Sequence, residues 1–214
     1  MAVKAKICGI TTPEAAQAAL DGRAALLGFM FFPKSPRAIG AEAAGRLAEP
    51  ARRLGVKVVA VTVDPSDDEL DVITRHAHPD LIQLHGKESP ARVREVRART
   101  GCGIVKVLPV AEAADIAAAA AYEPVVDHLM FETKPPPDAE RPGGLGRPFD
   151  WSLMRGRRFQ KPWMLAGGLD PWNVAEAIET SGAPMVDVSS GVERGPGLKD
   201  PALITAFLDA VRRA

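Results

Sequence analysis

Cysteine is scarce in this sequence, since the 214 residues contain only Cys8 and Cys102. Cys8 ends the first predicted strand, whereas Cys102 lies at a junction between a predicted helix and the next strand. In a barrel of parallel strands these two positions lie at opposite ends. We therefore expect no disulfide between them, because a disulfide needs its two Cα atoms within about 7 Å.

The sequence also lacks an excess of charge and a long apolar run. Lys plus Arg and Asp plus Glu both total 27, so nothing favours nucleic acid or an anionic membrane as the main partner. The longest apolar stretch, residues 24–32, is too short to span a bilayer, and residues 1–6 contain no apolar signal region. We expect a cytoplasmic protein. The balanced charge and the lack of an apolar surface stripe favour a monomer over a homodimer.

Short apolar runs alternate with amphipathic or alanine-rich segments along the whole chain. The predicted strands are 3–8, 25–30, 56–63, 81–84, 104–108, 128–131, 163–165 and 185–188. The predicted helices are 13–21, 41–54, 67–77, 90–100, 111–121, 150–155, 171–181 and 201–213. Eight strand–helix pairs predict an α/β protein, a single-domain (β/α)8 or TIM barrel over residues 1–214. An open doubly wound sheet is the alternative, but no Gly-x-Gly-x-x-Gly follows the first strand.

Polar residues stand at the carboxyl ends of several predicted strands or in the loops that follow. They are Cys8, Arg37, Asp64, His85, Glu132 and Asp187. Catalytic groups of a (β/α)8 barrel come from this end, so the sequence predicts a catalytic or binding site there. The pair His76 and His78 lies at the end of a predicted helix, at the other end of the barrel, and we expect no metal.

Glycines follow the last two predicted strands. Gly167 and Gly168 follow the seventh strand, and Gly191, preceded by Ser190, follows the eighth. The loops after strands seven and eight of such barrels bind phosphate through backbone N–H groups, and glycine lets the backbone approach the anion closely. A phosphorylated small molecule is therefore the expected ligand. The guanidinium of Arg37 can hold a carboxylate through two parallel hydrogen bonds.

Taken together, these segments resemble phosphoribosylanthranilate isomerase, an enzyme of tryptophan biosynthesis. The matching segments are KICGIT (6–11), SPR (35–37), QLHG (83–86), GGLG (143–146) with FDW (149–151), LAGGL (165–169), and DVSSGVE (187–193) with PG (196–197). They follow the family's order and cover essentially the whole chain.

The resemblance implies an Amadori rearrangement of N-(5-phosphoribosyl)anthranilate to 1-(2-carboxyphenylamino)-1-deoxyribulose 5-phosphate, without a cofactor. It implies that Cys8 is the general base and that Arg37 holds the anthranilate carboxylate. It places Asp187 and His85 among the substrate-binding residues. The phosphate is expected on Gly167, Gly168, Ser190 and Gly191, and the loop with Gly144 and Gly146 is expected to close over the ligand. We further infer that Lys6, two residues before Cys8 on the same strand face, lowers the pKa of the thiol.

One position departs from the family. Its general acid is an aspartate at the end of strand six, where this chain has Glu132, so Glu132 is the expected acid. The glutamate is one methylene longer, which changes its reach rather than its acidity. A catalytically impaired barrel that only binds a phosphorylated aromatic ligand is the alternative. A related isomerase of histidine biosynthesis, with a two-phosphate substrate, is disfavoured because the loop 64–68 is acidic.

Overall fold

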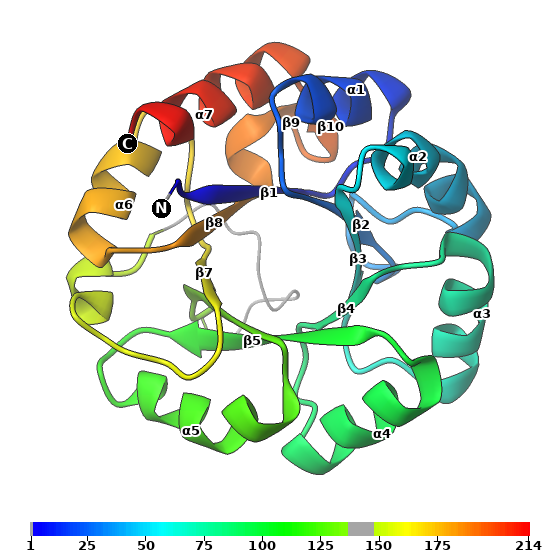
Figure 1. The fold of residues 1–214 in the computed structure, drawn as a ribbon, viewed down its shortest axis with the longest axis horizontal. Helices are drawn as coiled ribbons and strands as arrows, with labels where there is room; N and C mark the ends of the chain where they lie inside the picture. The colour runs from blue at the N-terminus through cyan, green and yellow to red at the C-terminus, as the bar shows by residue number, and fades with distance from the viewer. Residues whose placement is uncertain (1, 137–147) are drawn as a thin grey trace.

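Eight parallel strands form a closed barrel in this protein (Figure 1). The computed structural model describes residues 2–136 and 148–214, so the predicted loop residues Gly144 and Gly146 lie outside the described residues. The strands are β1 (Lys4–Cys8), β2 (Leu26–Met30), β3 (Lys57–Thr62), β4 (Leu81–Leu84), β5 (Gly103–Val110), β6 (His128–Thr133), β7 (Trp163–Leu165) and β8 (Met185–Val188). The ring closes because β1 pairs with both β2 and β8. Closure confirms the predicted (β/α)8 barrel over the open sheet.

Helices surround the barrel, as Figure 1 shows. They are α1 (Pro13–Asp21), α2 (Ala41–Arg53), α3 (Asp67–Ala77), α4 (Pro90–Thr100), α5 (Ala119–Tyr122), α6 (Val174–Ser181) and α7 (Pro201–Arg213). Five of them, α1, α2, α3, α4 and α7, begin at the predicted residue, and all of these except α2 follow a side chain that accepts a hydrogen bond from an N–H group of the first turn. These caps are Thr12, Ser66, Ser89 and Asp200. In the described part of the chain, no helix has the length and apolar character needed to cross a membrane.

The prediction of a helix over residues 111–121 is wrong for most of that segment. β5 runs on to Val110, and the carboxylate of Asp115 then accepts hydrogen bonds from the N–H groups of Ala111 and Glu112. This side chain satisfies backbone donors in a turn, in competition with helix formation. The short elements around α5 are η1 (Asp115–Ala118) and η2 (Glu123–Val125).

Two later predictions also differ in extent. The segment predicted as a helix over 150–155 is a single 3-10 turn, η3 (Trp151–Met154). The helix predicted to begin at Pro171 begins at Val174, because the Asp170 carboxylate holds the N–H groups of Trp172 and Asn173 in a turn. The sequence did not predict the hairpin of β9 (Glu193–Gly195) and β10 (Leu198–Lys199), which follows the 3-10 turn η4 (Ser190–Val192).

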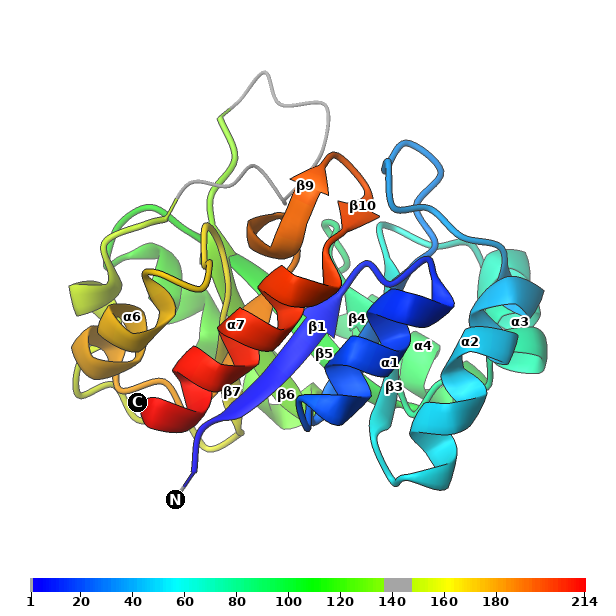
Figure 2. The same cartoon turned by 90° about the horizontal axis from the view of Figure 1, so that it is seen from above.

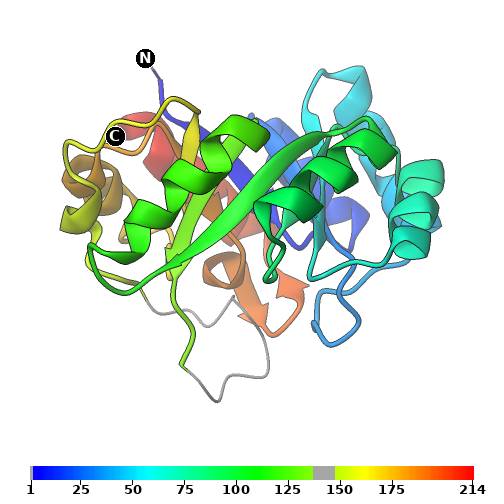
Figure 3. The ribbon, with the colours of Figure 1, turned by 90° about the horizontal axis from the view of Figure 1, so that it is seen from below.

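This hairpin stands on the barrel end where the strands finish. The loop between β2 and α2 projects from the same end, as both side views show (Figures 2 and 3). The two touch, since a Cβ atom added at Gly197 would lie 2.3 Å from the carbonyl oxygen of Pro36. The hairpin therefore packs on the loop that carries Arg37.

Apolar side chains fill the lower part of the barrel interior, and polar ones lie near its carboxyl end. Leu81, Met130 and Met185 belong to the interior apolar cluster. Since alternate residues of a strand share a face, the residues two positions later also point inward. Those residues are Gln83, Glu132 and Asp187. Lys6 and Cys8 share the inner face of β1 in the same way, so the sequence pattern gives the barrel a polar mouth.

Candidate active site

Lys6 and Asp187 form a buried ion pair beneath Cys8. The register of β1 and β8 places the two residues side by side, and Lys6 Nζ donates to Asp187 Oδ1 at 2.8 Å. The Lys6 side chain is fully buried. Burial opposes its charge, but the charge and hydrogen bond of Asp187, with a smaller contribution from Cys8, raise the pKa of Lys6 above its usual value. Lys6 is therefore a permanent cation in the barrel interior.

The Cys8 thiol is buried, and burial raises its pKa above the ordinary value. The charges of Lys6 and Lys199 act in the opposite direction, while Asp187 adds to the increase. The contribution of Lys6 has the predicted sign, but the pKa is raised on balance because desolvation of the thiolate is the larger effect. Cys102 is also a free thiol and lies before β5, at the other end of the barrel.

Gly28 on β2 makes room for Cys8, a role that the sequence analysis missed. A Cβ atom at this position would lie 3.0 Å from Cys8 Sγ and 3.1 Å from Lys6 Cε. The signal was present in the sequence, because Gly28 interrupts an otherwise large and apolar strand, LLGFM. Glycine inside a strand often marks a close approach by another group.

Glu132 lies at the end of β6, with its carboxylate against His85. Glu132 Oε2 is 2.9 Å from His85 Nε2, although the contact lacks the angles of a hydrogen bond. On the other side of the ring, His85 Nδ1 is 3.5 Å from the amide nitrogen of Gln83. Both Gln83 and Glu132 are buried. The sequence predicted His85 as a substrate contact, and the structure pairs it with the expected acid.

Cys8 and Glu132 lie at the barrel mouth on two strands that are not neighbours. β1 and β6 are separated by β8 and β7 in the closed ring, and both side chains point inward. A thiol and a carboxyl group that both point into the barrel mouth from separate strands are groups that acid/base chemistry on a small molecule can use. Asp127, at the start of β6, lies at the other end of the strand, where its carboxylate accepts from the N–H of Ile104.

Arg37 is buried and held by a carboxylate that the sequence analysis did not assign. Its Nε and Nη2 donate to the two carboxylate oxygens of Glu193 at 2.7 and 2.9 Å. Lys199 Nζ donates to Glu193 Oε1 at 2.6 Å. Burial raises the pKa of Glu193, but the Arg37 hydrogen bonds and the Lys199 charge outweigh it, so that the pKa lies below its usual value. Burial lowers the pKa of Lys199 despite this pairing.

The loops after β7 and β8 meet at the expected phosphate position. Gly167 and Gly168 have φ angles of +91° and +65°, which favour glycine. A Cβ atom at Gly191 would lie 1.9 Å from the carbonyl oxygen of Leu169, so the two loops are in contact. In the described residues we find no acceptor for the N–H groups of Gly167, Gly168, Ser190 and Gly191. These half-buried donors can therefore bind an anion.

Asp64, at the end of β3, has a structural role. Its Oδ1 accepts from the N–H of Lys87 at 2.7 Å, and its own N–H donates to Glu88 Oε1 at 2.9 Å. Glu88 in turn pairs with Lys106 Nζ at 2.6 Å, and both side chains are buried. This buried pair, which the sequence analysis missed, joins the loops after β3 and β4. Its signal is the single lysine in the apolar strand GIVKVLPV.

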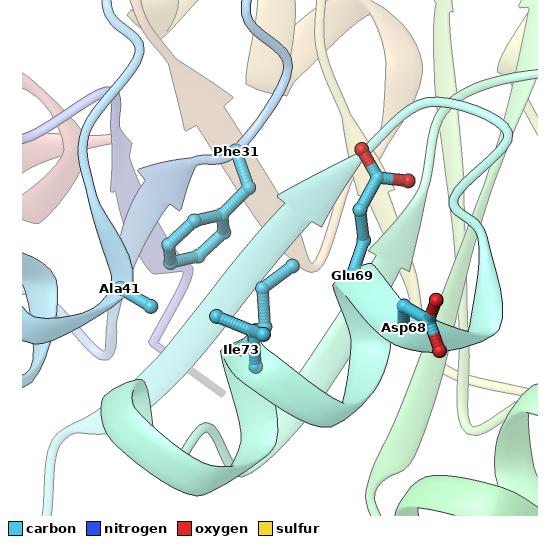
Figure 4. A pocket seen from close by; sticks show the side chains of 6 residues that line it. Phe31, Ala41, Asp68, Glu69 and Ile73 are labelled. Carbon is cyan, nitrogen blue, oxygen red and sulfur yellow. The ribbon is translucent and has the colours of Figure 1, made fainter.

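A cavity of about 290 Å³ lies away from this mouth, outside the barrel. It is lined by Phe31, Ala41, Asp68, Glu69, Val72 and Ile73, and Figure 4 shows Phe31, which follows β2, beside Ile73 of α3. None of the predicted site residues lines it. The candidate site is therefore the barrel mouth, where the thiol, the carboxyl group and the free N–H donors meet.

Known proteins are similar to this chain in sequence. The family model described as N-(5'-phosphoribosyl)anthranilate (PRA) isomerase matches residues 5–210. The N-(5'-phosphoribosyl)anthranilate isomerase of Caulobacter vibrioides is 61% identical over 210 residues, which are 98% of this chain and 96% of that protein.

Solved structures of phosphoribosyl anthranilate isomerases are similar to this chain in fold and sequence. A phosphoribosyl anthranilate isomerase in complex with reduced 1-(o-carboxyphenylamino)-1-deoxyribulose 5-phosphate is 31% identical, with a TM-score of 0.81, and the alignment covers 99% of this chain and 100% of that one. Monomers generated from the dimeric isomerase of Thermotoga maritima give 32% identity and a TM-score of 0.82, with 99% and 100% covered. The chain therefore belongs to the N-(5'-phosphoribosyl)anthranilate isomerase family.

Proposed function

We propose that this chain converts N-(5'-phosphoribosyl)anthranilate to 1-(2-carboxyphenylamino)-1-deoxyribulose 5-phosphate, with Cys8 as base and Glu132 as acid. The observation that carries the proposal is the order of groups around the barrel mouth. Glu132 is followed by the N–H donors after β7 and β8, then by Cys8 on β1, and then by Arg37 after β2. The substrate has a phosphate at one end and a carboxylate at the other. A substrate with its phosphate at the β7 and β8 loops and its carboxylate at Arg37 would extend past Cys8, with its reacting carbons inside the mouth that Glu132 also lines.

The chemistry follows from these positions. Glu132 donates a proton to the ring oxygen, the bond between that oxygen and C1 breaks, and the nitrogen lone pair forms the C1=N bond of a protonated Schiff base. The Cys8 thiolate then removes the proton from C2, and the electron pair moves through C1 to nitrogen to give an enolamine. Tautomerisation places a proton on C1 and releases the hydroxyl proton at C2, leaving the ketone. No atoms are gained or lost overall.

Glu132 is supported as the acid by its surroundings. Its carboxylate reaches the inner face of the barrel mouth and contacts His85. The alternative of a binding protein without catalysis gains no support, because both the proposed base and the proposed acid lie at strand ends around the same barrel mouth. The alternative two-phosphate substrate is disfavoured as well. The N–H groups of Asp64 and Lys87, in the loops after β3 and β4, are already bound by carboxylates.

Turnover of freshly prepared N-(5'-phosphoribosyl)anthranilate, followed by anthranilate-type fluorescence, tests the proposal. Wild-type protein should turn the substrate over, and Cys8→Ser and Glu132→Gln should each lower kcat by a factor of about a hundred or more. Both variants should still bind the reduced product analogue. Full activity in Glu132→Gln would refute the acid assignment, and wild-type protein that binds the analogue without turnover would restore the alternative of an impaired barrel.

We also propose that the chain acts as a monomer in the cytoplasm. All the proposed site residues come from one chain. The large apolar side chains that are exposed in the described residues come from four separate segments, namely Leu54, Val72, Trp172 and Leu198. Single exposed apolar side chains are normal for a monomer. The Thermotoga relative is described as dimeric, so the oligomeric state needs its own measurement.

A further inference from the structure

Glu193 lies at the centre of a buried charge cluster beside the barrel mouth. Its carboxylate accepts two hydrogen bonds from Arg37, one from Lys199 Nζ and one from the N–H of Gly197 at 3.2 Å. The side chains of Arg37, Glu193 and Lys199 are 6%, 4% and 0% exposed. Burying such a cluster is costly unless every charged group is paired. The complete pairing and burial of these three side chains distinguish the cluster from a chance contact on the surface.

The pairing with Glu193 determines which side of the guanidinium remains for a ligand. Glu193 occupies the edge formed by Nε and Nη2. Nη1 has no hydrogen-bond acceptor among the described residues. A guanidinium carries five N–H donors in a fixed plane, so a second carboxylate can bind at the Nη1 side of the same plane.

Backbone contacts restrict Arg37 further. Gly9, directly after Cys8, has a φ of +79°, and a Cβ atom there would lie 2.6 Å from Arg37 Cδ. The β9–β10 hairpin presses on the preceding residue, since Gly197 lies against the carbonyl oxygen of Pro36. Arg37 therefore lies between the exit of β1 and the hairpin, and Glu193 fixes the orientation of its planar end.

The charges also match a single bound carboxylate. The charge of Arg37 disfavours the charge of Lys199, and the carboxylate of Glu193 accepts hydrogen bonds from both side chains. Two cations and one anion leave one net positive charge at this place. Without Glu193, two buried cations would repel each other, and Arg37 would lose the contact that orients it.

We propose that Glu193 is a positioning residue that holds Arg37 in place for the aromatic carboxylate of the substrate and so makes the site selective for a carboxylated ligand. The proposal rests on the proposed function, because it takes Arg37 as the carboxylate-binding group. Glu193 touches no reacting atom. Its effect is on binding and selectivity, through Arg37.

Two ligands separate this role from a general structural one. The first is the reduced product analogue, and the second is its counterpart made from aniline, which lacks the carboxylate. Glu193→Gln should weaken binding of the carboxylated ligand by about ten- to a hundredfold, the usual range for a hydrogen bond to a charged group. Binding of the aniline-derived ligand should stay unchanged. The exposed Glu179→Gln on α6 is the matched control and should alter neither affinity.

Two further variants keep the test decisive. Glu193→Asp retains all charges but is too short to reach Nε, Nη2 and Lys199 together, so it should lose affinity for the carboxylated ligand alone even if Glu193→Gln fails to fold. In an Arg37→Gln background, Glu193→Gln should add little further loss. Equal losses for both ligands, or none for either, would overturn the proposal. Wild-type protein that binds both ligands equally would instead refute the assignment of Arg37, and with it the basis of the role of Glu193.

Discussion

Cys8, the proposed base, lies in an environment that disfavours its charged form. Burial raises the pKa of the thiol, while Lys6 and Lys199 lower it by a smaller amount. The thiol is therefore protonated at neutral pH in the free protein. The thiolate, which is the form proposed to act as the base, is a minor species, and its fraction grows as the pH rises.

The pH dependence of kcat/KM should show this directly. Since kcat/KM reports the free enzyme, it should rise by up to about tenfold per pH unit through the neutral and mildly alkaline range. Lys199→Met removes a cation that lowers the pKa of Cys8, so the rise should move to higher pH. A flat profile over this range in steady-state kinetics would contradict Cys8 as a base with a raised pKa.

Gly28 is the residue whose replacement should affect Cys8 most selectively. In Gly28→Ala the added methyl group lies against Cys8 Sγ and Lys6 Cε and must displace one of them. We expect kcat to fall by about ten- to a hundredfold, because small misplacements of a catalytic group have effects of this size. Affinity for the product analogue should change little.

Gly40→Ala is the matched control, because a Cβ atom at Gly40 meets no atom within 4 Å. Its kcat should equal that of the wild type. An unchanged kcat in Gly28→Ala would show that the thiol and the lysine have room to move.

At the level of elements, the buried Glu88–Lys106 pair connects three successive parts of the barrel. Lys106 on β5 donates to the carbonyl oxygens of Leu84 and Gly86 as well as to Glu88. These contacts lie under the segment that carries His85. The pair therefore holds the β4 loop in the position that brings His85 to Glu132.

Removal of one partner should be strongly destabilising. Glu88→Gln leaves Lys106 buried without its counter-charge, and we expect a loss of about 3–5 kcal/mol in the free energy of unfolding. The double variant Glu88→Gln/Lys106→Met should recover part of it. The exposed pairs of Glu49 with Arg52 and Arg53 provide the control, since Glu49→Gln should cost less than about 1 kcal/mol. Denaturant titrations measure all three, and equal losses at Glu88 and Glu49 would contradict this account.

At the level of the whole molecule, the closed ring determines which groups meet. The proposed phosphate donors and Arg37 lie on either side of Cys8 because β7, β8, β1 and β2 are consecutive in the ring. One chain thus supplies every proposed contact to the substrate. A second chain is not required for the site.

The mass in solution should accordingly be that of one chain. Light scattering after gel filtration, over a concentration series that spans about a hundredfold, measures it. A mass of two chains that persists at the lowest concentration would contradict the monomer. Activity per chain that falls on dilution would indicate that the partner contributes to the site.

The amino-acid sequence alone determined the order of the elements and the end of the barrel at which the proposed site residues lie. Alternating apolar runs predicted the strands, and the residues at their ends, among them Cys8, Glu132 and Asp187, lie at the mouth as expected. These features are local, because strand period and helix caps depend on neighbouring residues. The alanine-rich segment 111–121 was mispredicted, because its Asp115 side chain holds a turn that propensity does not reveal.

Only the tertiary structure decided which side chains pair and how burial changes their charge. Lys6 meets Asp187, and Arg37 meets Glu193, across 181 and 156 residues of sequence. These partners come together only when the ring closes in one register. The raised pKa of Cys8 likewise arises from desolvation by the assembled barrel, against the local influence of Lys6 that the sequence suggested. Spacing along a strand sets the direction of a side chain, whereas its partners and its dielectric surroundings come from distant segments.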